Sequence, residues 1–109
     1  MSKLVAISIG DIKGIGIELL IREWKRNKIK DFVLFTNIKY IKNYIRIKRL
    51  KIKLNIINNN EYNFNKEYLN IYNYKSYSNE ENTFLSIKNG FLECKKNNFI
   101  GLITLPLRK

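Results

Sequence analysis

The stretch from Ile7 to Leu20 constrains the fold of this chain more than any other. It starts within a short apolar run, residues 3–9, which is rich in Leu, Val and Ile and is typical of a strand buried on both faces. Glycines follow at positions 10, 14 and 16, and they permit backbone conformations that other residues rarely adopt. Apolar residues then recur at helical spacing, at Ile17, Leu20, Ile21 and Trp24. The pattern predicts a strand, a glycine turn and a helix over residues 15–27.

The glycine turn is a candidate anion site. Free backbone N–H groups at a helix start, together with the positive end of the helix dipole, attract negative charge. Neither the GxGxxG pattern nor GxxxxGK[ST] is present, so no standard phosphate-binding fingerprint applies. From the residues alone, a ligand-binding loop and a tight turn without a ligand are about equally favoured. In the second case Glu18 simply complements the helix dipole.

The remaining chain continues the alternation of strands and helices. A strand is predicted at residues 31–36, and Asn37 is placed to cap a helix over residues 38–49 with an apolar face of isoleucines. Residues 51–56 alternate lysine or asparagine with aliphatic side chains, which predicts a strand near a sheet edge. Another strand is expected at 68–72. This order favours an α/β fold with right-handed crossovers around a mostly parallel sheet.

The longest helix is expected at residues 78–98. Ser78 and Glu81 have the spacing of a capping box. Gly90 lies inside this helix, where its expected purpose is close packing on the sheet. We expect a buried helical stripe and a last strand at residues 99–105; the stripe consists of Phe84, Ile87, Phe91 and Cys94.

Two segments carry a resemblance to a known family. Gly10–Glu18, GDIKGIGIE, resembles the N-terminal GDPxGIGPE signature of the 4-hydroxythreonine-4-phosphate dehydrogenase family of vitamin B6 biosynthesis. Gly101–Lys109, GLITLPLRK, resembles that family's strand and loop ending in TxPxxK. The two prolines of the first signature are Ile12 and Ile17 here. The resemblance spans nearly the whole chain, but only about the first third of a family member.

The resemblance implies the N-terminal part of an isocitrate/isopropylmalate dehydrogenase-like fold, as one partial domain over residues 1–109. It implies a chain shortened by truncation, a frameshift or gene decay. The full-length family oxidises and decarboxylates 4-phosphohydroxy-L-threonine with NAD or NADP and a divalent metal (zinc, magnesium or cobalt), as a homodimer. A related dehydrogenase of the isopropylmalate type fits the C-terminal segment less well. Transferred to this chain, the signatures give candidate cofactor-binding residues in two groups: Gly10, Asp11, Gly14, Gly16 and Glu18 in the glycine turn, and Thr104, Pro106 and Lys109 in the C-terminal loop.

Catalytic groups are scarce in the sequence. It has no histidine, so it offers no Ser/His or Cys/His pair and no histidine metal ligand. The single Cys94 is expected to pack as a small hydrophobe. The family's metal-binding and catalytic histidines have no counterpart here, so we assign no catalytic residue and no metal ligand, and we expect the chain alone to be inactive.

The formal charge of +12 suggests a different function, the binding of polyanions such as nucleic acid. Lysine outnumbers arginine 16 to 5, and Ile, Asn, Lys and Tyr make up 57 of the 109 residues, a bias expected from AT-rich coding DNA. Composition therefore explains the charge, and we expect only weak, salt-sensitive binding of nucleic acid and no specific nucleic-acid partner. The alternative is a stand-alone basic α/β module that binds phosphorylated ligands or RNA. No apolar run has the length of a membrane helix, so no membrane association and a cytoplasmic location are expected.

Overall fold

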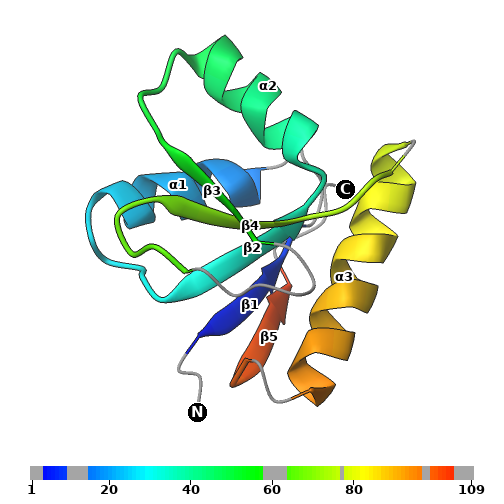
Figure 1. The fold of residues 1–109 in the computed structure, drawn as a ribbon. Coiled ribbons are helices and arrows are strands. Elements are labelled where there is room, and N and C mark those ends of the chain that lie inside the picture. Colours follow the sequence, from blue (N-terminus) through cyan, green and yellow to red (C-terminus); the bar gives the residue numbers. More distant parts are fainter. Residues whose placement is uncertain (1–3, 10–14, 58–63, 77, 97–98, 105–109) are drawn as a thin grey trace.

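The computed structural model describes residues 4–9, 15–57, 64–76, 78–96 and 99–104 (Figure 1). Strands and helices alternate along most of the chain, as the sequence predicts. In chain order the elements are β1 (Val5–Ser8), α1 (Ile15–Lys25), β2 (Phe32–Thr36), α2 (Ile38–Lys48), β3 (Leu54–Ile57), β4 (Leu69–Asn73), α3 (Asn79–Lys95) and β5 (Gly101–Thr104).

The five strands form one sheet in the order β3-β4-β2-β1-β5, and every pairing in it is parallel. This confirms the predicted α/β fold. Strand β3 lies at one edge of the sheet, as expected, but it begins at Leu54 rather than at Lys51, so the two lysines lie before the strand. Ile56 was expected on its covered face but is 39% exposed, and Ile57 is fully buried instead.

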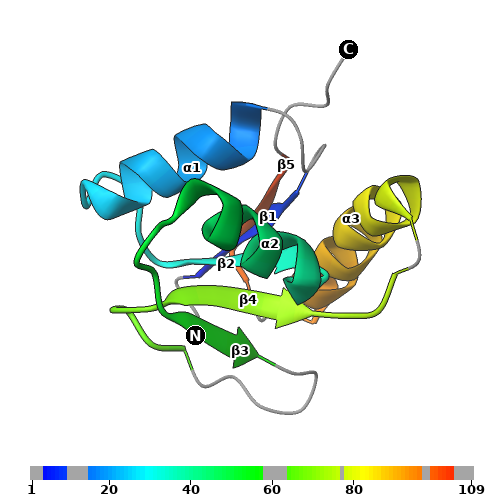
Figure 2. The same ribbon diagram turned by 90° about the horizontal axis from the view of Figure 1, so that it is seen from above.

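Helices cover both faces of the sheet. Figures 1 and 2 show α1 and α2 on one side and α3 on the other. The helical spacing of apolar residues in α1 and α2 correctly predicts the larger of the two cores. That core joins Ile17, Leu20 and Ile21 of α1 and Ile41 of α2 to strand side chains that include Ile7, Leu34 and Ile71.

The smaller core lies on the α3 side of the sheet. Its centre is Phe35, whose ring stacks on Tyr72 with centroids 4.5 Å apart and meets Phe99 edge-on at 5.5 Å. The half-buried Cys94 packs against this cluster, in agreement with its expected role as a small hydrophobe.

The predicted orientation of α3 is wrong. Phe84 and Phe91 are 64% and 56% exposed, whereas the side turned to the sheet carries Asn82, Ser86 and Glu93. The physical reason is that α3 packs over polar strand ends, where its amide and hydroxyl side chains form hydrogen bonds that apolar side chains could not make.

Gly90 fulfils its predicted role on this same side of α3. A Cβ atom at Gly90 would lie 2.7 Å from Cδ1 of Leu102 in β5, which is closer than two carbon atoms can approach. The glycine therefore allows the helix to pack directly on the last strand.

Both predicted helix caps are present. The Asn37 side chain accepts a hydrogen bond from the Lys39 N–H at 3.1 Å, and the Ser78 hydroxyl accepts one from the Glu81 N–H at 3.1 Å. These side chains satisfy N–H groups that the first turn of a helix leaves without partners. Among the described residues, no helix is both long enough and apolar enough to cross a membrane.

Candidate functional site at the carboxyl edge of the sheet

The carboxyl ends of the parallel strands form the candidate site. Helices α1, α2 and α3 follow β1, β2 and β4 respectively, so all three begin at this edge. Ligands of open parallel α/β sheets bind outside the carboxyl ends of the strands, where helix N-termini favour anions. The fold thus directs attention to this edge independently of any motif.

The strands next to the two turns of the family resemblance end side by side there. β1 pairs with β5 so that Ser8 lies beside Thr104, although the two residues are far apart in the sequence. The glycine turn begins two residues after Ser8, and the C-terminal loop begins directly after Thr104. The sheet therefore directs both segments to the same edge.

Three of the predicted site residues lie in the described part of the chain. Gly16 is buried in the first turn of α1, and no described glycine has a positive φ. Glu18 is half-exposed and pairs with Arg22 at 3.6 Å, and Thr104 is exposed at the end of β5. The other predicted site residues lie outside the described residues: Gly10, Asp11, Gly14, Pro106 and Lys109.

A buried polar network lies beside these residues and was not predicted from the sequence. Ser86 of α3 joins two strands, because its hydroxyl accepts a hydrogen bond from the Ile9 N–H at 2.7 Å and donates one to the Phe35 carbonyl at 2.6 Å. Asn82, one turn earlier, accepts from the Asn37 N–H at 2.9 Å and donates to the Thr36 hydroxyl at 3.2 Å. Ser86 and Thr36 are fully buried and Asn82 is 1% exposed, so the network fixes the start of α3 on the ends of β1 and β2.

The network extends to the loop after β4. Asn73 accepts a hydrogen bond from the Ile38 N–H at 2.8 Å, and the Asn37 amide donates to the Ser76 hydroxyl at 3.2 Å. The Tyr74 hydroxyl donates to the Asn82 carbonyl at 2.8 Å. The starts of α2 and α3 are thereby tied to each other as well as to the sheet.

Ser8 differs from every other residue of this edge. It is fully buried, and its Oγ is the only buried side-chain oxygen or nitrogen in the described part of the chain that has no hydrogen-bond partner. A buried hydroxyl without a partner costs about 1–3 kcal/mol. It lies where β1 ends, between Phe35 of β2 and Thr104 of β5 in the register.

The chemistry of this edge is that of binding. The side chains of the buried network at this edge are hydroxyls and amides, which donate and accept hydrogen bonds but carry no charge, and Glu18 is the one charged residue among the described predicted site residues. Burial raises the pKa of Tyr74 far above its usual range. Tyr74 therefore remains a neutral donor at physiological pH and is unsuited to act as a general base.

The metal implied by the resemblance has no ligand set here. Among the described residues no group of three or more Cys, Asp or Glu side chains could hold an ion, and the sequence contains no histidine. Neutral hydroxyl and amide groups suit a phosphate or a polar substrate better than a divalent cation bound by this chain alone.

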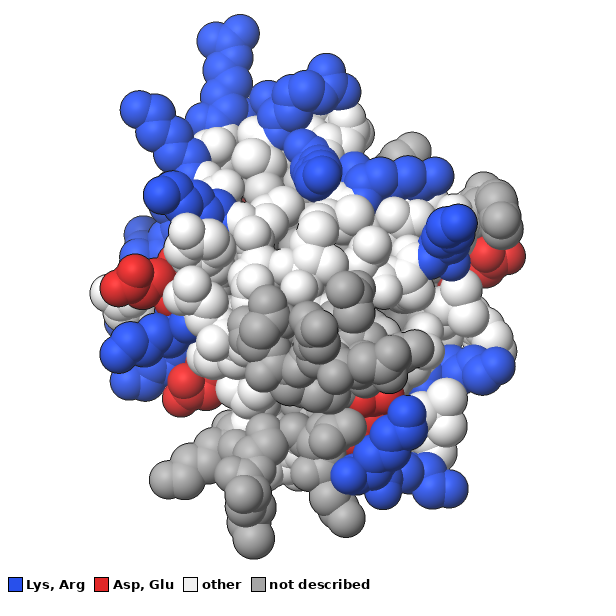
Figure 3. Space-filling model, in the orientation of Figure 1, with Lys and Arg blue, Asp and Glu red and all other residues white. Residues whose placement is uncertain are grey.

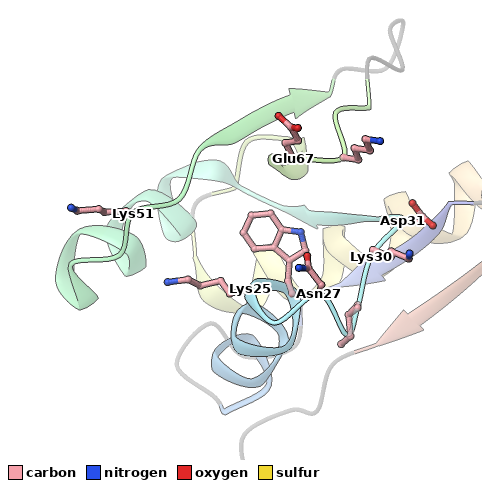
Figure 4. A pocket seen from close by; sticks show the side chains of 9 residues that line it. Lys25, Asn27, Lys30, Asp31, Lys51 and Glu67 are labelled. Atoms are coloured by element: carbon pink, nitrogen blue, oxygen red, sulfur yellow. The ribbon is translucent and has the colours of Figure 1, made fainter.

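A hollow lies at the opposite edge of the sheet, where the amino-terminal ends of the strands are. It has a volume of about 600 Å³ and is lined by Trp24, Asn27, Ile29, Asp31, Glu67 and the lysines 25, 30, 51 and 66. Figure 4 shows Lys25 and Lys51 on one side of the hollow and Lys30 and Asp31 on the other. Asp31 directly precedes β2 and Lys51 precedes β3, so this hollow is separate from the edge where the glycine turn begins.

Positive charge is not confined to the hollow, where four lysines lie. Lys and Arg side chains crowd the surface over α2, where Figure 3 shows no acidic side chain. The sequence of α2 contains four basic residues and no acid: Lys39, Lys42, Arg46 and Lys48.

Comparison with known proteins gives a structural match that bears on the fold. No protein-family model and no curated protein sequence matches the chain. Among solved structures, a protein from Salmonella typhimurium described as a candidate 4-hydroxythreonine-4-phosphate dehydrogenase is similar with a TM-score of 0.82 and 18% sequence identity. The match covers 99% of this chain and 39% of that one, so the chain spans about two fifths of the length of its structural neighbour. At this identity the likeness establishes a shared fold.

Proposed function

We propose that this chain is the N-terminal part of a dehydrogenase that acts on 4-phosphohydroxy-L-threonine or a closely similar phosphorylated hydroxy amino acid. Its part in the reaction is to bind and orient the substrate at the carboxyl edge of the sheet. The full enzyme would need NAD or NADP as hydride acceptor and a divalent metal as Lewis acid, and we assign no described residue of this chain to either group. The proposal places the protein in the cytoplasm, where a soluble phosphorylated substrate would be available.

The observation that carries this proposal is the pairing of Ser8 with Thr104. Two segments that resemble signatures of one family, separated by most of the chain, leave adjacent parallel strands at the same edge. The shared fold with a described dehydrogenase of this kind supports the same assignment. Neither observation depends on the charge of the protein, which its composition explains.

The residues of this chain supply hydrogen-bond donors rather than reacting groups. The first turn of α1 presents backbone N–H groups that have no partner within the helix, and the Thr104 side chain is exposed at the same edge of the sheet. Such groups suit a phosphate or carboxylate oxygen. The Thr36–Asn82–Ser86 network holds the strand ends in place, which keeps these donors in a fixed arrangement.

A chimeric enzyme tests the proposal. The chain would replace the matched 39% of the Salmonella protein, and the product would be assayed with 4-phosphohydroxy-L-threonine and NAD or NADP. We expect turnover above that of the truncated Salmonella protein. Thr104→Val should lower kcat/KM at least about tenfold by removing a polar contact at the site, whereas Ile47→Ala, on the outer surface of α2, should not. A folded chimera without turnover would contradict the proposal.

The hollow at the amino-terminal edge supports a second candidate function, a basic module that binds phosphorylated aromatic ligands. Four lysines surround Trp24 there, and an aromatic ring can stack a base while lysines attract phosphates. Asp31 and Glu67 in the same lining weaken the attraction for anions, and for this reason we place this function second.

Trp24 is the only tryptophan in the sequence, so its fluorescence reports directly on this hollow. The second function predicts a saturable change in fluorescence on addition of ATP, weakened several-fold by Lys51→Ala. Lys88→Ala on α3 is the matched control, since Lys88 does not line the hollow. The dehydrogenase proposal predicts no saturable change at physiological salt.

A further inference from the structure

Among the described helices and strands, α3 carries the most exposed large apolar side chains. Phe84, Ile87 and Phe91 are 64%, 38% and 56% exposed, and the neighbouring Leu92 is 42% exposed. Phe84, Ile87 and Phe91 are spaced three and then four residues apart, which is the spacing of a coiled-coil seam. A helix that is apolar on its outer face as well as packed on a sheet normally meets another helix.

We propose that this face of α3 binds α3 of a second copy of the chain, with the two helices antiparallel. The proposal goes beyond the dehydrogenase function and does not depend on it. It concerns an interface between copies and names the helix, the direction and the register of that interface.

The charges along α3 argue for a second copy in this direction. Its first turn carries Glu80 and its last turn carries Lys95, and both side chains are exposed. In an antiparallel pair the first turn of each helix lies against the last turn of the other. Glu80 of each copy then lies near Lys95 of the other copy, so the same contact forms at both ends of the interface, as two-fold symmetry requires.

The apolar residues give the same register. The residues of this face are placed symmetrically about the midpoint between Ile87 and Lys88. Phe84 and Phe91 lie equally far from this midpoint on either side, and so do Glu80 and Lys95. An alignment that stacks Phe84 on the second copy's Phe91 therefore also brings Glu80 to the second copy's Lys95. The Lys95 ammonium already lies 5.5 Å from the centre of the Phe91 ring, which places the positive charge beside the seam.

The centre of the pair would contain Ile87 and, beside it, Lys88 from both copies. The long aliphatic stem of lysine can cover the edge of the seam while its ammonium stays in water, so the two like charges can remain apart. A single helix pair is small for a protein interface, and we therefore expect a dissociation constant on the order of 10–100 μM.

Sedimentation velocity of the whole chain from about 1 μM to about 1 mM tests the proposal, with concentrations chosen to span that affinity. The chain should pass from monomer to dimer over this range. Phe91→Asp should weaken the dimer at least tenfold, roughly the cost of placing a charge in an apolar seam. Leu19→Asp on α1 is the matched control, because Leu19 is also an exposed aliphatic residue, at 46%, but lies on another helix.

Charge reversal tests the register and the direction. Glu80→Lys and Lys95→Glu should each weaken the dimer, and the double variant should restore it, because each copy would then meet the reversed partner of the other. Circular dichroism would verify that every variant is folded. A parallel pair would bring equal charges together in the wild type and in the double variant, so charge reversal would not give this pattern.

Cross-linking provides a readout that does not depend on affinity. In a Cys94→Ser background, Lys88→Cys places a thiol beside the two-fold axis and should form a disulfide-linked dimer on mild oxidation, whereas Lys28→Cys should not. A chain that stays monomeric at the highest concentration would overturn the proposal and leave the surface to a different partner. A dimer unaffected by Phe91→Asp, or not restored by the double charge reversal, would also overturn it.

Discussion

Ser8 and Ser86 lie at the same end of the sheet, but only one of their two hydroxyl groups has hydrogen-bond partners. The Ser86 hydroxyl joins a strand N–H and a strand carbonyl, whereas the Ser8 hydroxyl has no partner among the described residues, and both residues are fully buried. A hydroxyl that is held by neighbours stabilises the fold. One that is buried without a partner destabilises the fold.

Alanine substitution should separate the two serines. Ser86→Ala leaves the buried Ile9 N–H without an acceptor and should lower the free energy of unfolding by about 2 kcal/mol. Ser8→Ala removes a costly unpaired group and should leave the free energy of unfolding unchanged or raise it by up to about 1 kcal/mol. Urea denaturation measures both. A clear loss of stability in Ser8→Ala would show that its hydroxyl has a structural partner.

Gly90 offers a second test at the residue scale, because a Cβ there would contact Leu102. Gly90→Val should destabilise the protein by about 2 kcal/mol through overpacking. Shortening the neighbour in Leu102→Ala should recover part of that loss, so the two changes should not be additive in a double-mutant cycle. Additive losses would mean that the helix and strand do not meet at this point.

Helices α1 and α2 were predictable as elements, whereas the orientation of α3 was not. The first two pack on a wholly apolar face of the sheet, so the spacing of their isoleucines and leucines identifies the buried side. The buried side of α3 is defined by partners far away in the sequence: Ser86 bonds to a residue 77 positions earlier, and Asn82 to one 45 positions earlier. The spacing of apolar residues within the helix does not indicate such distant partners.

One sequence signal for the true orientation did exist. Asn82, Ser86 and Gly90 recur every four residues, which is a stripe of small or polar side chains along α3. The apolar stripe on the opposite side is equally regular and dominated the prediction. The candidate site shows the same limit: the sequence indicated the glycine turn and the C-terminal loop, but not the network of Thr36, Asn82 and Ser86.

The N-cap of α3 provides a prediction at the element scale. Ser78→Ala removes the acceptor for the Glu81 N–H and should cost about 1 kcal/mol of stability. Ser78→Asp retains an acceptor and adds a negative charge at the positive end of the helix dipole, so its stability should equal or exceed that of the wild type. Thermal unfolding of the two variants compares them, and equal losses in both would contradict a capping role.

At the scale of the whole molecule, the net charge of +12 should produce binding without specificity. On the face seen in Figure 3, positive side chains lie at many places around the surface instead of along one groove. Fluorescence anisotropy with several unrelated RNAs should give similar affinities that fall steeply between 50 and 200 mM salt, roughly as counterion release requires. A preference of about 1000-fold for one RNA at physiological salt would instead favour the basic binding module.

The most direct test of the central claim is to locate the binding of the phosphorylated substrate by amide chemical shifts in the ¹⁵N-labelled chain. We predict that 4-phosphohydroxy-L-threonine shifts amides at the carboxyl edge, around Ser8, Gly16 and Thr104, and that unphosphorylated 4-hydroxythreonine does so much more weakly. Ser8→Ala should reduce the response without unfolding the chain. Shifts confined to the hollow around Trp24, or no saturable shifts at millimolar ligand, would contradict the account.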